Sequence, residues 1–165
     1  MSSLTSNHLL TKKEIHSYTR NGFVVPKFRL DNSDLEKLQN ATLELMQTYP
    51  NIPAKGLVSP HIFYAGFNCP VIHSKFLEIC KLAPLIDIVD QLIGADIIVW
   101  GRRISSKAPQ TERATPWHPD GEYWPIRPLS SATVWIPIDE SNENNGCLKI
   151  FTGCNRAKIL LPHQS

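Results

Sequence analysis

The sequence predicts an α+β fold in which helices come first and an antiparallel sheet follows. Capping motifs and helical spacing of apolar residues are confined to residues 1–95. Residues 96–107, 131–139 and 147–153 are rich in β-branched and aromatic side chains, and Pro, Asn and Gly separate them. A chain of 165 residues with 42% hydrophobic content is long enough for one domain with its own core.

Two capping motifs predict where the first helices begin. Thr11-Lys12-Lys13-Glu14 has the T-x-x-E form, and its helix should end at Asn21-Gly22 with glycine in the left-handed conformation. Ser33-Asp34-Leu35-Glu36 predicts a second helix that runs to Tyr49-Pro50. Its apolar stripe is expected to be core and no cofactor site: Leu35, Leu38, Ala41 with Thr42, Leu45 and Met46.

The middle of the chain is expected to alternate between short strands and short helices. Residues 23–28 and 61–67 are candidate strands. Two short helices are expected over about 74–82 and about 84–93, with Pro84 in the first turn of the second helix and Gly94 at its end. The sequence contains no internal repeat and no interdomain linker.

Composition and charge exclude several function classes. Seventeen basic and fifteen acidic residues give a net charge of +2 without a basic cluster, so neither nucleic acid nor a membrane is an expected partner. The four cysteines form no CxxC pair, which argues against structural zinc and favours reduced thiols in a cytoplasmic protein. The first residues lack the apolar core of a signal peptide, and His163-Gln164-Ser165 is not an SKL-type peroxisomal address.

The octet WHPDGEYW (117–124) contains the pattern of half a metal site. On an extended segment, the side chains of His118 and Asp120 project to the same face, so both can reach one ion. A second histidine from elsewhere would complete the facial triad of non-haem Fe(II) oxygenases. Six histidines in this composition produce roughly half an H-x-[DE] pattern by chance, so a surface His–Asp pair is the competing interpretation.

From Lys107 onward the chain resembles the phytanoyl-CoA dioxygenase family of Fe(II)/2-oxoglutarate oxygenases. The resemblance is carried by PWHPDGEYWPIRP, TVWIPIDESNENNGCLKIFTG and LLPH, and the helical entry TKKEIHSYTRNGFVVP is also similar. It implies a double-stranded β-helix, a cupin-like jelly roll with the metal between two sheets. The chain would then be one domain over 1–165, with a helical entry over 1–95 and the first β-helix strands, including the HxD motif, over 96–165.

The resemblance also implies which residues bind the cofactors. His118 and Asp120 match the iron ligands, and Trp135 with Thr133 matches the lining of the 2-oxoglutarate pocket. Arg103 and Lys107 lie on the strand that passes beneath this co-substrate in relatives. Ascorbate is a further candidate cofactor.

Other positions that match the family motifs are expected to be structural or differ from the pattern. Asn145-Gly146 matches a structural turn, and Cys147 a packed strand residue. The chain differs from the family at Pro119, where many relatives carry Gln. Thr152, Cys154 and Asn155 also replace the usual residues of P-G-[ST]-H-[RK].

The third iron ligand is the missing part of this pattern. In a jelly roll the second histidine should follow the first by on the order of 50 residues or more. After Asp120 the only histidine is His163, in a position that does not match the family's ligand. The fold is therefore expected to be incomplete at its C-terminus, without the distal His and the Arg that binds 2-oxoglutarate. Open sheet edges would then allow self-association.

Three interpretations remain open at this point. The chain is an oxygenase that hydroxylates a small-molecule or acyl-type substrate and releases succinate and CO2. Alternatively, it is an inactive truncated fragment or split half that needs another chain, which leaves its own status as an enzyme open. A metal-binding jelly roll without oxygenase chemistry is the third class.

Overall fold

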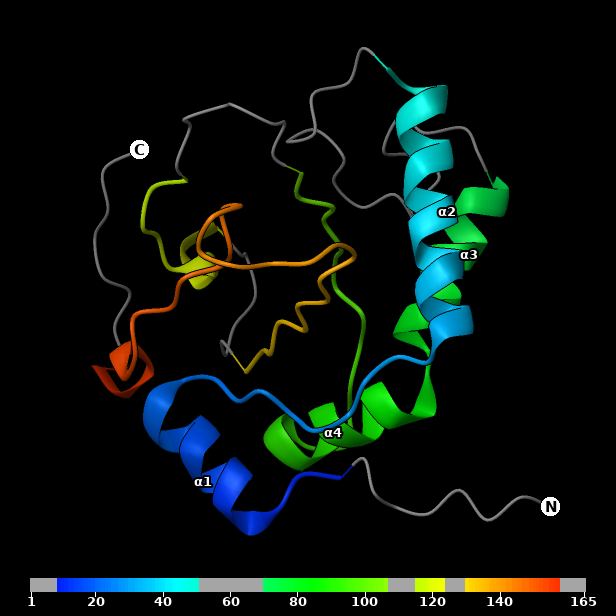
Figure 1. Cartoon of the computed structure of the whole chain (residues 1–165). Helices are drawn as coiled ribbons and strands as arrows, with labels where there is room; N and C mark the ends of the chain where they lie inside the picture. Colours follow the sequence, from blue (N-terminus) through cyan, green and yellow to red (C-terminus); the bar gives the residue numbers. More distant parts are fainter. Residues whose placement is uncertain (1–8, 51–69, 107–114, 124–129, 158–165) are drawn as a thin grey trace, which may run out of the picture.

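The computed structural model describes residues 9–50, 70–106, 115–123 and 130–157. Within these ranges the chain forms four α-helices: α1 (Lys12–Asn21), α2 (Asn32–Thr48), α3 (Pro70–Cys80) and α4 (Ala83–Ile93). Two 3-10 turns follow, η2 (Asp120–Tyr123) and η3 (Cys154–Ala157). The long helices α2 and α3 pack side by side, whereas α1 and α4 lie together at the other end of the molecule (Figure 1).

Helix α1 has the ends that its sequence predicts. The Thr11 hydroxyl accepts a hydrogen bond from the Glu14 N–H at 3.2 Å, and the Glu14 carboxylate accepts one from the Thr11 N–H at 2.8 Å. At the other end Gly22 adopts the left-handed conformation (φ 86°) and donates its N–H to the Tyr18 carbonyl at 2.8 Å. The reciprocal capping box and the glycine cap are both confirmed.

Helix α2 begins earlier than the capping motif at Ser33 predicts, and that prediction is wrong. Asp31 is the N-cap, and its carboxylate accepts the N–H of Asp34 at 2.8 Å. Aspartate caps as well as serine does, and its charge also interacts with the positive end of the helix dipole. The earlier cap additionally brings Asn32 and Ser33 into the helix.

The apolar stripe of α2 forms the centre of the core, as predicted. Leu38, Ala41, Thr42 and Leu45 are buried, and the Thr42 hydroxyl donates to the Leu38 carbonyl at 2.8 Å. Leu38, Ala41 and Leu45 share one cluster with Phe76 and Ile79 of α3 and with Ile104. Met46, at the edge of the stripe, is 40% exposed.

Helix α4 keeps Pro84 in its first turn and ends at Gly94, as expected, whereas α3 begins four residues before the predicted start at 74.

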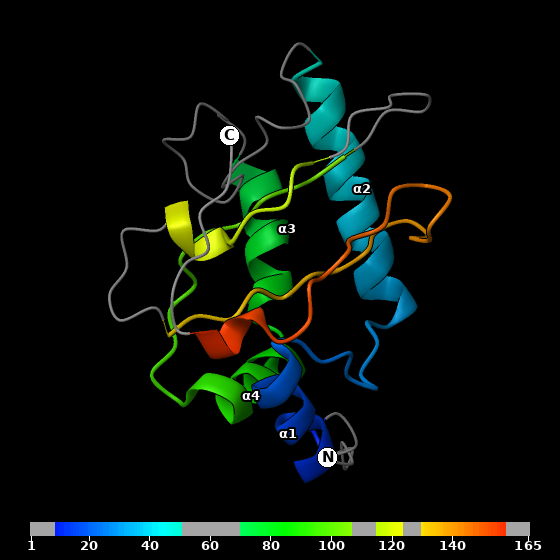
Figure 2. The same ribbon diagram turned by 90° about the vertical axis from the view of Figure 1, so that its left-hand side faces the viewer.

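The segments predicted as strands form no β-ladder within the described residues, apart from a single bridge at Arg103. The segments at 96–106 and 131–139 run across one side of the α2–α3 pair (Figure 2), where Ile104, Ile136 and Ile138 pack against the helical core. The expected strand at 23–28 is absent. Pro26 offers no N–H, and Arg29 donates to the carbonyls of Pro26 and Phe28, which a ladder would otherwise use.

Two turns fix the last described segment. Asn145 accepts the Asn142 N–H at 2.8 Å, donates to the Glu140 carbonyl at 2.6 Å, and precedes Gly146 with φ 82°. Asn145-Gly146 therefore has the structural role that was predicted. The second turn is joined to the helical end, because Gly153 donates its N–H to the Asn21 carbonyl at 2.9 Å.

The candidate strand at 61–67 and the LLPH segment (160–163) lie outside the described residues. None of the described helices has the length and apolar character needed to cross a membrane.

Candidate metal centre

The loop 115–119 and the turn η2 bring His118 and Asp120 together. The imidazole Nε2 lies 3.4 Å from Asp120 Oδ1, and the two side chains are 29% and 56% exposed. Asp120 starts η2 rather than continuing an extended strand, but the two side chains still point to the same side. The two side chains therefore lie close together, and the pair is accessible from solvent.

The other ring nitrogen of His118 lies beside a backbone carbonyl oxygen. Nδ1 lies 2.8 Å from the carbonyl oxygen of Pro116. A carbonyl oxygen can only accept, so Nδ1 carries a proton, and in a neutral ring the lone pair of Nε2 faces Asp120. Two electron-rich atoms repel at this distance unless a proton or a cation lies between them. A histidine that donates one N–H to a backbone carbonyl and offers its other nitrogen is the usual arrangement of a metal ligand.

The spacing of the two atoms also fits one bound ion. Metal–ligand bonds of about 2.1 Å, at an angle of about 90° to 110°, place two ligand atoms about 3.0 to 3.4 Å apart. The observed 3.4 Å falls in this range and exceeds the distance of a good N–H···O hydrogen bond. His118 Nε2 and Asp120 Oδ1 thus fit a divalent transition metal as two neighbouring ligands.

A third protein ligand is not found in the part of the chain that the structure describes, where no three His, Cys, Asp or Glu side chains converge. Cys80, Cys147 and Cys154 are free thiols. Of the other histidines, only the exposed His16 has a described side chain, and it lies on α1. His163 lies outside the described residues, so the expectation of a missing distal ligand stays a prediction.

The predicted 2-oxoglutarate residues come from two other segments. Arg103 precedes Ile104, and Thr133 and Trp135 alternate with Ile136 on the next segment. Ile104 and Ile136 pack against the helical core, whereas the three candidates beside them in the sequence do not. Each is exposed, and none makes a side-chain hydrogen bond or ion pair within the described ranges. Lys107, the fourth candidate, lies outside those ranges.

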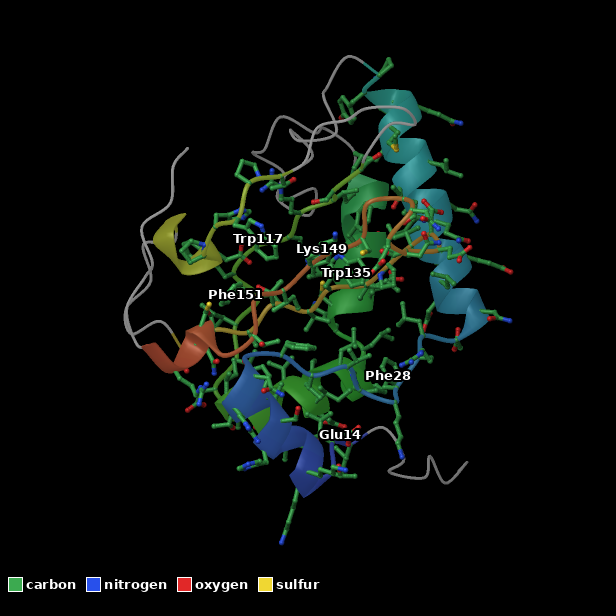
Figure 3. All side chains as sticks on the ribbon, turned by 60° about the vertical axis from the view of Figure 1, so that its left-hand side comes forward. Glu14, Phe28, Trp117, Trp135, Lys149 and Phe151 are labelled. Carbon is green, nitrogen blue, oxygen red and sulfur yellow. The ribbon has the colours of Figure 1, made fainter. Side chains whose placement is uncertain are left out.

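One neighbour of the metal pair is not identifiable from the sequence. The rings of Trp117 and Phe151 meet edge to face, with centroids 6.4 Å apart and planes at 87° (Figure 3). The aromatic character of Trp117 is visible in the octet, but no signal in the sequence pairs it with a residue 34 positions away.

Comparison with known proteins identifies the family. Residues 18–158, which include the His118–Asp120 pair, match the family of phytanoyl-CoA dioxygenase (PhyH). The chain belongs to this family. Membership implies a cupin-like fold.

The relatives share low identity with this chain over between half and nearly all of its length. Peroxisomal phytanoyl-CoA dioxygenase from Bos taurus is 23% identical over 173 residues, which cover 95% of this chain and 51% of the bovine protein. Ectoine dioxygenase from Streptomyces avermitilis is 26% identical over 156 residues, 89% of this chain and 52% of that protein. L-proline trans-4-hydroxylase from Streptomyces griseoviridis is 26% identical over 93 residues, 52% of this chain and 35% of that enzyme. No solved structure matches the chain. The chain spans about half the length of the bovine and S. avermitilis relatives.

Proposed function

We propose that this chain carries the two N-terminal iron ligands of an Fe(II)/2-oxoglutarate-dependent dioxygenase. The enzyme would hydroxylate a small-molecule or acyl-type substrate and release succinate and CO2. The observation that carries the proposal is the geometry of one pair inside the family match: His118 Nε2 lies 3.4 Å from Asp120 Oδ1 while Nδ1 donates to Pro116.

Each candidate residue has a role that suits its chemistry. His118 and Asp120 would hold Fe(II), which when bound supplies the redox chemistry for hydroxylation. The guanidinium of Arg103 and the ammonium of Lys107 complement a dicarboxylate, and the Thr133 hydroxyl can donate to one. The indole of Trp135 supplies an apolar wall that limits access of water.

A second candidate function has its own support. In it, the chain is an inactive fragment or split half that needs another chain, which is compatible with the described residues, where no three metal-ligating side chains converge. In this case the chain binds metal weakly and is inactive alone. A cytoplasmic location also remains a proposal, which imaging of the tagged protein in its own cell would test.

Anaerobic addition of Fe(II) and 2-oxoglutarate to the purified chain tests both candidates. A visible charge-transfer band at stoichiometric iron, followed by succinate formation in air, would establish the oxygenase for this chain alone. Weak metal binding without succinate would favour the second candidate. Co(II), added without 2-oxoglutarate, reports binding to the His–Asp pair through its visible absorption.

Matched variants attribute the binding to this pair. His118→Ala and Asp120→Asn should each weaken Co(II) binding by about tenfold or more, because loss of a ligand costs at least as much as loss of its orienting partner. His16→Ala, at an exposed position on α1, should leave binding unchanged. Equal Co(II) affinity in the His118→Ala and unsubstituted chains would refute the assignment of the metal centre.

A further inference from the structure

The edge-to-face contact of Trp117 and Phe151 joins the loop 115–119, which carries His118, to the segment 147–153. The ring centroids are 6.4 Å apart and the planes nearly perpendicular, the geometry that aromatic quadrupoles favour. Trp117 stands between Pro116, which accepts the Nδ1 hydrogen bond, and His118, which donates it. Any rotation of the backbone at Trp117 therefore changes the position of the imidazole relative to its acceptor.

The partner ring is held by a segment that is itself anchored. Two residues after Phe151, the Gly153 N–H donates to the Asn21 carbonyl at the end of α1. The Asn155 side chain also donates to the Thr19 carbonyl at 2.9 Å. Phe151 is thus tied to the helical end of the molecule, whereas Trp117 belongs to a short loop.

Burial does not explain the contact. Trp117 is 62% exposed and Phe151 is 72% exposed, so little apolar surface is removed from water. Leu148 and Ile150, on the same segment, are also largely exposed apolar side chains. What distinguishes Phe151 from these neighbours is the directional contact of its ring with Trp117 (Figure 3).

We infer that Phe151 is a positioning residue that holds the His118 imidazole in the Nδ1–H tautomer through Trp117. The consequence for metal binding rests on the proposed function, but the effect on the ring does not. An aromatic pair of this geometry changes an equilibrium by about twofold to tenfold. Its loss should therefore let the loop rotate and weaken the Nδ1–H···O hydrogen bond to Pro116.

The test uses the metal-free protein and long-range 15N NMR of the histidine rings. In the unsubstituted chain, the Nδ1 resonance of His118 should be that of a protonated nitrogen. Phe151→Leu keeps apolar bulk but removes the quadrupole, and it should shift His118 toward a mixture that includes the Nε2–H tautomer. Phe151→Tyr keeps an aromatic ring and should give the same His118 spectrum as the unsubstituted chain. Ile150→Leu, a matched change on the same segment, should also leave that spectrum unaltered. An unchanged tautomer in Phe151→Leu would overturn the inference.

Co(II) affinity then separates this inference from the proposed function. Phe151→Leu should bind Co(II) about twofold to tenfold more weakly, and Phe151→Tyr should bind like the unsubstituted chain. A tautomer shift in a chain that binds no Co(II) would support the positioning role while it contradicts the metal centre. Unaltered NMR and unaltered affinity in Phe151→Leu would contradict the positioning role alone.

Discussion

Gly22→Ala should destabilise the fold through two separate effects. Gly22 has φ 86°, a conformation that costs an alanine about 1 kcal/mol net. A Cβ there would also lie 3.0 Å from Asn155 Oδ1. The Asn155 side chain can move away only by weakening its hydrogen bond to the Thr19 carbonyl, worth roughly 0.5 to 1 kcal/mol at this exposed position. The free energy of unfolding should fall by about 2 kcal/mol, and Tm by about 4 to 8 °C.

Urea denaturation followed by far-ultraviolet circular dichroism measures the change. Gly153→Ala is the matched control, because Gly153 has a similar φ of 82° but its Cβ would meet only the flexible end of Arg156 at 3.1 Å. That variant should lose about 1 kcal/mol. In an Asn155→Ala background, Gly22→Ala should cost about 1 kcal/mol as well, because the contact is gone. An equal cost at Gly22 in both backgrounds would refute the steric part of the reasoning.

Four further predictions concern the helices. Thr11→Ala should cost about 1 kcal/mol of unfolding free energy in urea titrations, since it removes the N-cap of α1. The backbone N–H and hydroxyl of Thr11 lower the pKa of Glu14, so the stabilisation by the Glu14 carboxylate is present at neutral pH and is lost as pH falls through the pKa of Glu14 in the folded protein. Glu14→Gln should therefore make stability in urea less sensitive to acidification below about pH 4. An unchanged pH profile would contradict this prediction. Leu45→Ala, at a fully buried position, should cost about 3 kcal/mol in thermal unfolding, whereas Leu43→Ala at 56% exposure should cost under about 1 kcal/mol. Gln91→Ala should cost about 2 kcal/mol, because Gln91 both accepts from and donates to the backbone of the N-terminal segment at 2.7 and 3.1 Å, and hydrogen exchange there should accelerate.

Much of the helical half could be predicted because its signals are local. The cap of α1 depends on Thr11 and Glu14, three residues apart, and Gly22 ends the helix by its own conformational freedom. The buried stripe of α2 follows from helical spacing. The start of α2 was placed wrongly because Asp31 and Ser33 are both good caps, and short-range pattern alone does not decide between them.

In the candidate site, too, local features could be predicted from the sequence and long-range contacts could not. The sequence by itself indicated the His118–Asp120 pair and the family, because only one residue separates the two side chains and the motifs around them match. Only the tertiary structure decided which nitrogen of His118 faces Asp120 and which ring supports the loop. The Trp117–Phe151 contact and the Gly153–Asn21 hydrogen bond join residues 34 and 132 positions apart. Such contacts depend on where the chain folds back on itself, and no periodicity within a single segment encodes that.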